Sequence, residues 1–336
     1  MHNKETKMII PPKLQSGDTI GFFSPSSPAT YFAKKRFIRA KKFLKQHNYN
    51  LIAGNLTGKS DFYRSGSIQE RAQELNDLIH NPDVKCIMAT IGGMNSNSIL
   101  PYIDYEALLK NPKIIIGYSD VTAILLAIYT ITNIQTYYGP DLVATFGEFS
   151  PIVDTTFTYF QNIVSSSNLP ISLPMPKQWT EEYIDWEIQT RPKILNDNRW
   201  LVIHKGIAQG RLIGGNLDTI LGIWGSPYMP EILPGDILFI EDTQKNAADI
   251  ERSFSLLKIN GVFDKIAGLI LGKHELFDDL GSGRKPYEIL LEVINEERYF
   301  PILADFDCCH TLPMLTVSIG CLIELDTMTP KVTILK

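Results

Sequence analysis

The first half of the chain alternates short apolar runs with amphipathic stretches, and few folds accommodate this alternation. Val84–Thr90 and Lys113–Tyr118 are apolar almost throughout, as strands buried on both faces are. Between the apolar runs, residues 32–47 and the segment after Ser67 carry apolar side chains at helical spacing, and Ser67 with Glu70 forms a capping box. Buried strands that alternate with helices predict an N-terminal α/β domain built on a parallel sheet.

The sequence changes character after about residue 150. Residues 165–200 are rich in Ser, Pro and Asn and contain Trp179 and Trp186, so we interpret them as a linker or an active-site flap. Beyond them the pattern predicts strands at 208–213, 236–240, 266–271, 316–324 and 331–335, and helices at about 246–259 and 286–297. We therefore expect three parts: an N-terminal domain over 1–165, a linker or flap over 166–205, and a C-terminal domain over 206–336.

Length, charge and cysteine content exclude several classes of protein. The chain has 336 residues, which favours two domains over one, and a net charge of -5, which argues against a nucleic-acid partner. The most apolar stretch, Ala123–Ile131, is far shorter than the roughly 20 residues that cross a bilayer. No signal-peptide core is visible, so we expect a cytoplasmic protein without a membrane partner. The four cysteines form no C-x-x-C pair, which disfavours both a disulfide framework and a zinc site.

Ser119 lies where a predicted strand ends and a predicted helix begins. A serine at such a turn can act as a nucleophile, because the helix N-terminus behind it stabilises a developing oxyanion. The alternative is an ordinary helix N-cap, for which serine and aspartate are the commonest residues. Gly92-Gly93 follows the neighbouring strand and either lets the backbone approach a ligand or forms a plain tight turn. The chain contains no G-x-G-x-x-G motif, so a dinucleotide cofactor is not predicted.

The second half offers a carboxylate and several histidines for acid–base chemistry. Glu241-Asp242 ends an apolar strand, where a carboxylate can orient a base or, alternatively, cap the next segment. His204, His274 and His310 are the candidates for a general base, since imidazole titrates near neutrality. The residues themselves do not rank these three histidines, and each can instead have a purely structural role.

Two further features have both a functional and a structural interpretation. Trp179 and Trp186 could stack on the ring of a ligand, or could hold the flap against the core. The run from Lys34 to Lys45 carries seven basic residues and no acidic one. It could steer a phosphate or a nucleic acid, but we interpret it as the solvated side of an amphipathic helix.

Five motifs, taken together and in their order along the chain, resemble the serine LD-carboxypeptidase family (peptidase family S66). The resemblance covers nearly the whole sequence. Within the family, the stretch Ile91–Pro101 and the chain length look most like the branch of the microcin C immunity peptidase. The five motifs are Gly92-Gly93, Gly117-Tyr-Ser-Asp120, Gly214-Gly-Asn216, Glu241-Asp242 and His310-Thr-Leu-Pro313.

The resemblance implies a fold and a catalytic site. The fold would be α/β, with an N-terminal parallel-sheet domain and a C-terminal mixed α/β domain that contains a β-barrel-like sheet. Ser119 would be the nucleophile, His310 the general base and Glu241 its orienting partner. The backbone N–H groups of Gly93 and Asp120 would form the oxyanion hole. The family is metal-free, uses no cofactor, and is cytoplasmic and usually dimeric, so a homodimer is expected.

Two substrate classes follow from the resemblance, and a third possibility is not enzymatic. One substrate class is a peptidyl- or aminoacyl-nucleotide antibiotic of microcin C type, which Trp186 favours because it falls in the flap where that branch stacks a nucleobase. The other is a muropeptide that loses its terminal D-residue. Asn216 and Glu275 are the candidates for polar substrate contacts. The non-enzymatic alternative is a small-ligand binding protein.

Cys308-Cys309 departs from the small residues that the family resemblance leads us to expect before His310, which raises a question about the packing of that loop.

Overall fold

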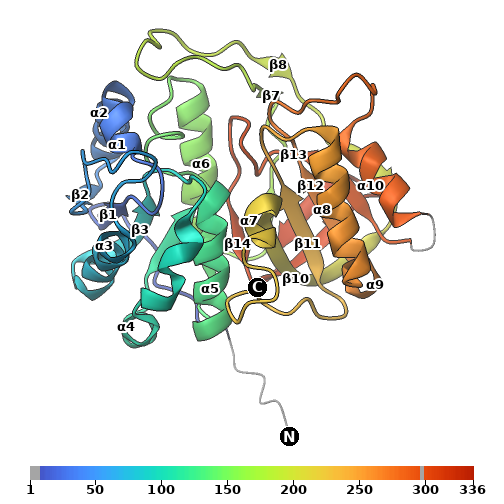
Figure 1. The fold of residues 1–336 in the computed structure, drawn as a ribbon, viewed down its shortest axis with the longest axis horizontal. Helices are drawn as coiled ribbons and strands as arrows, with labels where there is room; N and C mark the ends of the chain where they lie inside the picture. The colour runs from blue at the N-terminus through green and yellow to red at the C-terminus, as the bar shows by residue number, and fades with distance from the viewer. Residues whose placement is uncertain (1–7, 296–298) are drawn as a thin grey trace, which may run out of the picture.

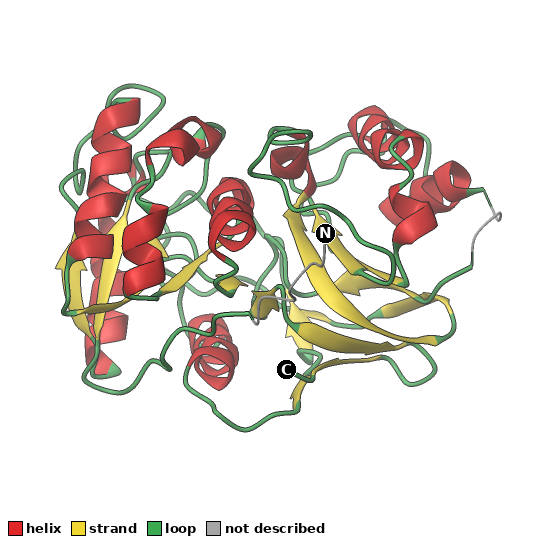
Figure 2. Ribbon diagram, turned by 90° about the horizontal axis from the view of Figure 1, so that it is seen from below, coloured by secondary structure: helices red, strands yellow, loops and turns green. Residues whose placement is uncertain are grey.

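The computed structural model describes residues 8–295 and 299–336, and its N-terminal part is built on a six-stranded sheet. The strand order is β14-β5-β4-β3-β1-β2, and all neighbours are parallel except β14 and β5. Every residue of β4 and β5 is buried, because helices cover both faces of the sheet (Figure 2). The strands are β1 (Thr19–Phe23), β2 (Asn50–Ala53), β3 (Val84–Ala89), β4 (Ile114–Gly117), β5 (Thr136–Tyr138) and β14 (Val317–Ile319).

The helices of this part begin close to the positions that the sequence pattern predicts. The capping box at Ser67 is confirmed: its hydroxyl accepts from the backbone N–H of Glu70, and the Glu70 carboxylate accepts from the N–H of Ser67. The α-helices are α1 (Ala29–Phe32), α2 (Lys34–Gln46), α3 (Ile68–His80), α4 (Tyr105–Lys110), α5 (Thr122–Thr132) and α6 (Ile152–Val164), and the 3₁₀ turns are η1 (Ser96–Tyr102) and η2 (Ser119–Val121).

The second part is built on an eight-stranded mixed sheet in the order β6-β16-β15-β10-β11-β12-β13-β9. Its central strands β10 to β13 are parallel, and the outer pairs are antiparallel. The strands are β6 (Ile171–Leu173), β9 (Leu201–His204), β10 (Ile207–Asn216), β11 (Ile237–Glu241), β12 (Gly268–Gly272), β13 (Ile302–Phe306), β15 (Leu322–Asp326) and β16 (Lys331–Ile334). The helices are α7 (Leu217–Leu221), α8 (Ala247–Ile259), α9 (Val262–Lys265) and α10 (Pro286–Ile294).

The two sheets lie side by side, with a junction between them (Figure 1). A long segment crosses above this junction and carries the short ribbon of β7 (Gln178–Trp179) and β8 (Asn196–Asp197). The backbone of Thr180 exchanges two hydrogen bonds with that of Leu312, at 2.8 and 3.0 Å, so this segment is fastened two residues beyond His310.

The prediction of one strand over 316–324 is wrong. The chain turns at Gly320, whose φ is +87°, and forms β14 in the first sheet and β15 in the second. A Cβ at position 320 would lie 2.2 Å from Cε2 of Tyr129, so only glycine fits this turn. The chain therefore crosses back to the first sheet near its end, and β14 adds an antiparallel strand beside β5.

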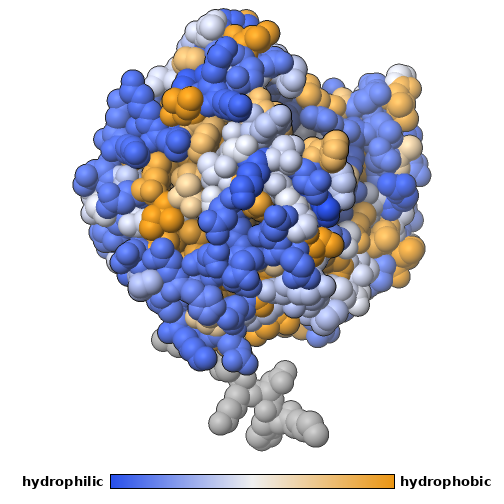
Figure 3. All heavy atoms as spheres, turned by 60° about the vertical axis from the view of Figure 1, so that its left-hand side comes forward, coloured by the Kyte–Doolittle hydropathy of each residue, from blue (hydrophilic) through white to orange (hydrophobic). Residues whose placement is uncertain are grey.

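The interpretation of the basic run as a solvated face is wrong for Arg36. On α2, Lys34, Lys35, Lys42 and Lys45 are exposed. Figure 3 turns the side of the molecule on which α2 lies toward the viewer, and hydrophilic residues there surround several hydrophobic areas. Arg36, in contrast, is 1% exposed and its guanidinium is paired with Glu148 at 2.9 Å.

Among the described residues no helix is long and apolar enough to span a membrane.

Candidate active site

Ser119 occupies a strained turn between β4 and α5. Its φ is +61°, in the left-handed region that residues other than glycine seldom adopt. Backbone strain of this kind is often found at functional sites. Its backbone N–H donates to the hydroxyl of Tyr138 at 3.1 Å, and its carbonyl accepts from Thr122 at 2.6 Å. A Cβ on Gly92 would lie 2.8 Å from the Cβ of Ser119, so glycine is needed where the two turns meet.

Gly93 and Asp120 lie on the two turns that meet beside Ser119. Gly93 has a φ of +148°, and a Cβ there would lie 2.3 Å from Oγ of Ser26. The Asp120 carboxylate accepts from the backbone N–H groups of Asn95 and Ser96, each at 2.9 Å, and thereby ties the glycine turn to the serine turn. Burial raises the pKa of Asp120 above its ordinary value, although these hydrogen bonds oppose the shift.

Glu241 and His310 form a buried pair at the end of β11. Nδ1 of His310 lies 2.7 Å from Oε2 of Glu241, and the Glu241 carboxylate is fully buried. Its other oxygen accepts from Tyr138 at 2.6 Å and from the amide of Asn216 at 3.1 Å. Gly272 makes room for it, since a Cβ there would lie 2.5 Å from the Cβ of Glu241.

The electrostatics of this pair favour an ionised carboxylate beside the imidazole. Burial alone would raise the pKa of Glu241, but the interaction with His310 and the donors Tyr138 and Asn216 outweigh it and hold the pKa below its ordinary value. Burial alone would lower the pKa of His310, yet the carboxylate of Glu241, followed by Glu275 and Asp242, raises it. An ionised Glu241 can only accept, so Nδ1 of His310 carries the proton of the neutral imidazole and Nε2 is the nitrogen that can take up a further proton.

The structure distinguishes the three histidines that the sequence left open. His204, the last residue of β9, stacks on Tyr299, with ring centroids 4.9 Å apart. His274 places Nδ1 3.0 Å from the carbonyl of Gly272, and burial lowers its pKa to about 4. Of the three, only His310 lines the cavity and contacts Glu241.

A cavity of about 820 Å³ brings most of the sequence-predicted site residues together. It is lined by both halves of the molecule and by the segment that crosses above their junction. Ser119 and His310 both face it, and the ring of Tyr118 packs edge-on against His310 at 4.9 Å between centroids. Of the residues named from the sequence, Gly93, Ser119, Asp120, Trp186, Asn216, Glu275 and His310 line the cavity, whereas Glu241 lies behind His310.

Asn216 and Glu275, the two predicted polar contacts, differ in how much of each side chain is free. The Asn216 amide donates to Glu241 and Asp242, and its carbonyl oxygen accepts from the backbone N–H of Thr219 at 3.0 Å to cap α7. Glu275 is half-buried and accepts from Thr243 at 2.8 Å through one oxygen. Burial raises the pKa of Glu275. Asn216 is thus largely engaged within the protein, whereas Glu275 presents a carboxylate to the cavity.

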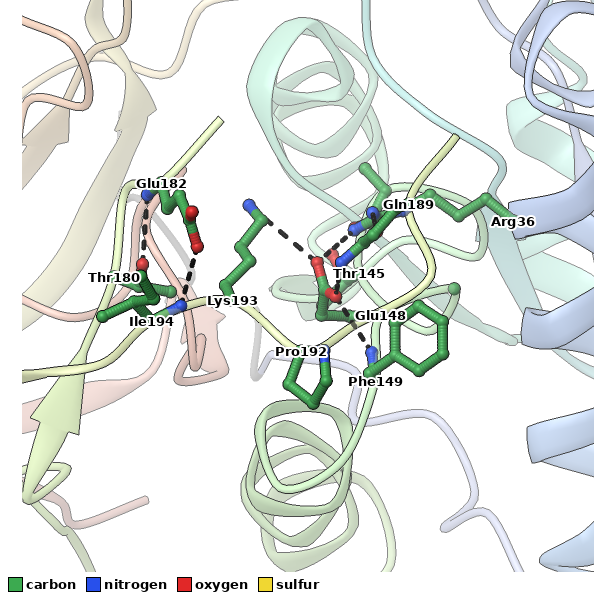
Figure 4. A network of polar contacts seen from close by, with 12 residues as sticks. Arg36, Thr145, Glu148, Phe149, Thr180, Glu182, Gln189, Pro192, Lys193 and Ile194 are labelled. Atoms are coloured by element: carbon green, nitrogen blue, oxygen red, sulfur yellow. Dashed lines mark hydrogen bonds and ion pairs between the residues drawn. The ribbon is translucent and has the colours of Figure 1, made fainter. Parts of the chain in front are cut away.

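Trp186 both holds the crossing segment and lines the cavity, so neither of its two interpretations excludes the other. Its ring is half-buried, stacks on Phe32 at 6.2 Å and carries the Arg36 guanidinium at 4.8 Å from its centroid. Figure 4 shows Arg36, Gln189 and Lys193 directed at one buried carboxylate, Glu148.

The sequence pattern does not reveal Tyr138, nor the residues that bind the crossing segment to the first part of the molecule, namely Arg36, Glu148 and Gln189. Arg36 lies in a basic run that resembles a solvated helix face, and Glu148 and Gln189 are isolated polar residues in irregular segments. Tyr138 follows another tyrosine in an apolar strand and resembles an ordinary core residue.

In the described part of the chain, no cluster of three or more His, Cys, Asp or Glu side chains could hold a metal ion.

Comparison with known proteins places this arrangement in a family. The model of the LD-carboxypeptidase N-terminal domain matches residues 20–139, and that of the LD-carboxypeptidase C-terminal domain matches residues 209–325. The microcin C7 self-immunity protein MccF of Escherichia coli is 54% identical over 95% of this chain and 93% of its own. The murein tetrapeptide carboxypeptidase of Pseudomonas aeruginosa is 25% identical over 68% of each chain.

Solved structures agree with the sequence comparison. MccF in complex with aspartyl sulfamoyl adenosine has a TM-score of 0.95, with 51% identity over 98% of both chains. An MccF-like protein from Bacillus anthracis has a TM-score of 0.87, with 31% identity over 98% of this chain and 99% of its own. Together with the fold, these relatives define a serine-type peptidase with an α/β architecture in two parts. The chain belongs to the LD-carboxypeptidase family, peptidase family S66.

Proposed function

We propose that this protein is a peptidase that uses a Ser119–His310–Glu241 triad. The observation that carries the proposal is the buried Glu241–His310 pair, 2.7 Å apart, whose imidazole faces the same cavity as the strained Ser119. His310 takes the hydroxyl proton of Ser119 as Oγ attacks an amide carbonyl carbon, and later gives that proton to the leaving nitrogen. Glu241 holds the imidazole tautomer and stabilises the imidazolium. Water then hydrolyses the acyl-enzyme, which releases the carboxylic acid and restores Ser119.

The developing oxyanion would be received by the backbone N–H groups of Gly93 and Asp120. Both residues line the cavity beside Ser119, and the Asp120 carboxylate fixes the two turns against each other through Asn95 and Ser96. Fixed N–H donors lower the barrier because they need no reorientation as charge develops. This mechanism involves no metal ion or cofactor.

The substrate class that we propose is an aminoacyl- or peptidyl-nucleotide antibiotic of microcin C type. Support comes from MccF, which is 54% identical and whose solved complexes contain aspartyl sulfamoyl adenosine and glutamyl sulfamoyl guanosine. In this chain the half-buried Trp186 lines the cavity, so a nucleobase bound there would contact its indole ring. Hydrolysis of the amide would separate the aminoacyl group from the nucleotide mimic and so confer immunity or resistance.

Hydrolysis of two substrates tests this proposal. Incubation with aspartyl sulfamoyl adenosine should release aspartate and sulfamoyl adenosine, whereas a muropeptide tetrapeptide should release little D-alanine. Trp186→Ala should raise KM for the nucleoside substrate through loss of stacking, which is worth roughly 1–3 kcal/mol per base, or about 5- to 150-fold. Trp200→Phe provides a control, since Trp200 is buried against Phe306 and does not line the cavity.

Two results would contradict the proposal in different ways. Release of D-alanine alone would assign the chain to muropeptide processing, as in the relative from Pseudomonas aeruginosa. Failure of a fluorophosphonate to label Ser119, together with no hydrolysis of either substrate, would leave a small-ligand binding protein. We also propose that the protein is a cytoplasmic homodimer. Size-exclusion chromatography with light scattering tests the dimer, and fractionation of cells that express the protein tests the location.

The pH dependence of kcat/KM should have an acid limb set by His310. A general base must be neutral, and the carboxylate of Glu241 outweighs burial and raises the pKa of His310, so kcat/KM should fall as the pH falls through a value above that of an ordinary imidazole. Glu275→Gln removes one of the negative charges that raise this pKa, and we expect the limb to move to lower pH. Glu106→Gln, at an exposed position on α4, is the control and should leave the limb in place. An unmoved limb in Glu275→Gln would refute this electrostatic role of Glu275.

A further inference from the structure

One buried phenol joins the turn of Ser119 to the Glu241–His310 pair. The hydroxyl of Tyr138 accepts from the backbone N–H of Ser119 at 3.1 Å and donates to Oε1 of Glu241 at 2.6 Å. Ser119 follows β4 in the first sheet, whereas Glu241 ends β11 in the second. A continuous path therefore runs from the Ser119 amide through the phenol and the carboxylate to His310.

The position of this ring is fixed from several sides. Tyr138 ends β5, where it pairs with Gly117 of β4, and its side chain is fully buried. The ring packs edge-on against Phe239 of β11, with centroids 5.3 Å apart. Gly215 lies against the same region, because a Cβ at that position would lie 2.6 Å from Cγ2 of Thr122 and 3.2 Å from Cε2 of Tyr138. The sequence thus provides a glycine on the second sheet opposite a tyrosine on the first.

We propose that Tyr138 is a positioning residue for the reaction, which holds the Ser119 turn and the Glu241 carboxylate in register across the junction of the two sheets. This inference rests on the triad proposed above. The strained backbone of Ser119 gains a fixed hydrogen-bond acceptor, and the buried carboxylate gains a neutral donor. Because one oxygen atom serves both, a shift of either sheet would lengthen at least one of the two hydrogen bonds.

The same hydrogen bond should set how strongly Glu241 acts on the imidazole. Tyr138 and Asn216 both donate to Oε1, and each donor withdraws charge from the carboxylate that faces His310. Removal of the phenol hydroxyl leaves more negative charge for the imidazolium, so protonated His310 becomes more stable. The acid limb of kcat/KM should then move to higher pH. Among the described residues, the other ionisable groups around His310 are Tyr118, whose ring packs against the imidazole, and Asp141, Asp242, His274 and Glu275. None of them changes in Tyr138→Phe or Tyr137→Phe.

The chain offers a matched control one residue away. Tyr137 is also fully buried in β5, but its hydroxyl has no hydrogen-bond partner among the described residues. Tyr137→Phe and Tyr138→Phe therefore remove the same atom from neighbouring buried rings, and only the second removal breaks the path between Ser119 and Glu241.

The test compares these two variants with the wild type, using aspartyl sulfamoyl adenosine as substrate. For Tyr138→Phe we expect kcat to fall about 10- to 100-fold, as for loss of a hydrogen bond to a charged group, with KM nearly unchanged. The acid limb should move to higher pH, and an NMR titration should show a higher pKa for His310. Tyr137→Phe should match the wild type in all three measurements.

The outcomes separate this inference from the proposed function. If the wild type hydrolyses the substrate and Tyr138→Phe keeps the same kcat, acid limb and His310 titration, Tyr138 has no positioning role. Equal losses in both tyrosine variants, or a loss of kcat in Tyr138→Phe without movement of the limb, would indicate general packing and also overturn the inference. If the wild type neither hydrolyses the substrate nor reacts with a fluorophosphonate, the triad proposal itself fails.

Discussion

Ser119→Ala is expected to lower kcat by about 10⁴-fold or more, while the protein remains folded. The variant removes the oxygen that attacks the substrate and leaves the turn intact, because serine and alanine have a similar cost at the φ of +61°. The backbone contacts to Tyr138 and Thr122 involve only main-chain atoms of residue 119, so they persist. Single-turnover and steady-state hydrolysis of aspartyl sulfamoyl adenosine would measure the loss.

A second serine variant separates catalysis from stability. Ser67 caps α3, and Ser67→Ala should lower the free energy of unfolding by roughly 1 kcal/mol without a change in kcat. Ser119→Ala should show the opposite behaviour, with a nearly unchanged melting temperature and little turnover. Near-normal turnover in Ser119→Ala would remove Ser119 from the mechanism.

The local elements of the fold could be predicted because each is encoded by adjacent residues. The parallel strands β3 and β4 are apolar almost throughout, and α3 begins with its own capping box. The sequence pattern does not reveal the split of 316–324 at Gly320, because both halves are strand-like and the ring that requires glycine there belongs to Tyr129, which is distant in sequence. The basic run predicts a surface position for Arg36, because nothing in the run reveals that one of its members pairs with the buried Glu148.

The candidate site follows the same principle. The turn of Ser119 and the strand end at Glu241 are visible in the sequence, because strand, turn and helix signals lie next to one another. The pairing of His310 with Glu241 spans 69 residues, and nothing local distinguishes it from His274. The resemblance selected His310, whereas Tyr138, 103 residues from Glu241, belonged to none of the recognised motifs.

Glu241→Gln should lower kcat by about 10³- to 10⁴-fold, although it changes only one atom of a residue that does not touch the substrate. Both carboxylate oxygens act as acceptors, one for His310 and the other for Tyr138 and Asn216. A glutamine can offer an acceptor at only one of these positions. If its NH₂ faces His310, the imidazole must take the wrong tautomer; if it faces Tyr138 and Asn216, it meets two donors. Either arrangement leaves the site mispaired.

The pH profile gives this prediction a signature that a general loss of structure lacks. The negative charge of Glu241 contributes most to raising the pKa of His310, so in Glu241→Gln the acid limb of kcat/KM should move to lower pH even as the plateau falls. Asp242→Asn, one residue further along, removes a carboxyl group that does not contact the imidazole. Burial raises the pKa of Asp242 to about 7, so near neutral pH this group carries only part of a negative charge. Asp242→Asn should produce a smaller shift in the same direction and retain most of kcat. If the two variants lose kcat equally, the orienting role belongs to the carboxylate cluster as a whole, and Glu241 loses its place in the triad.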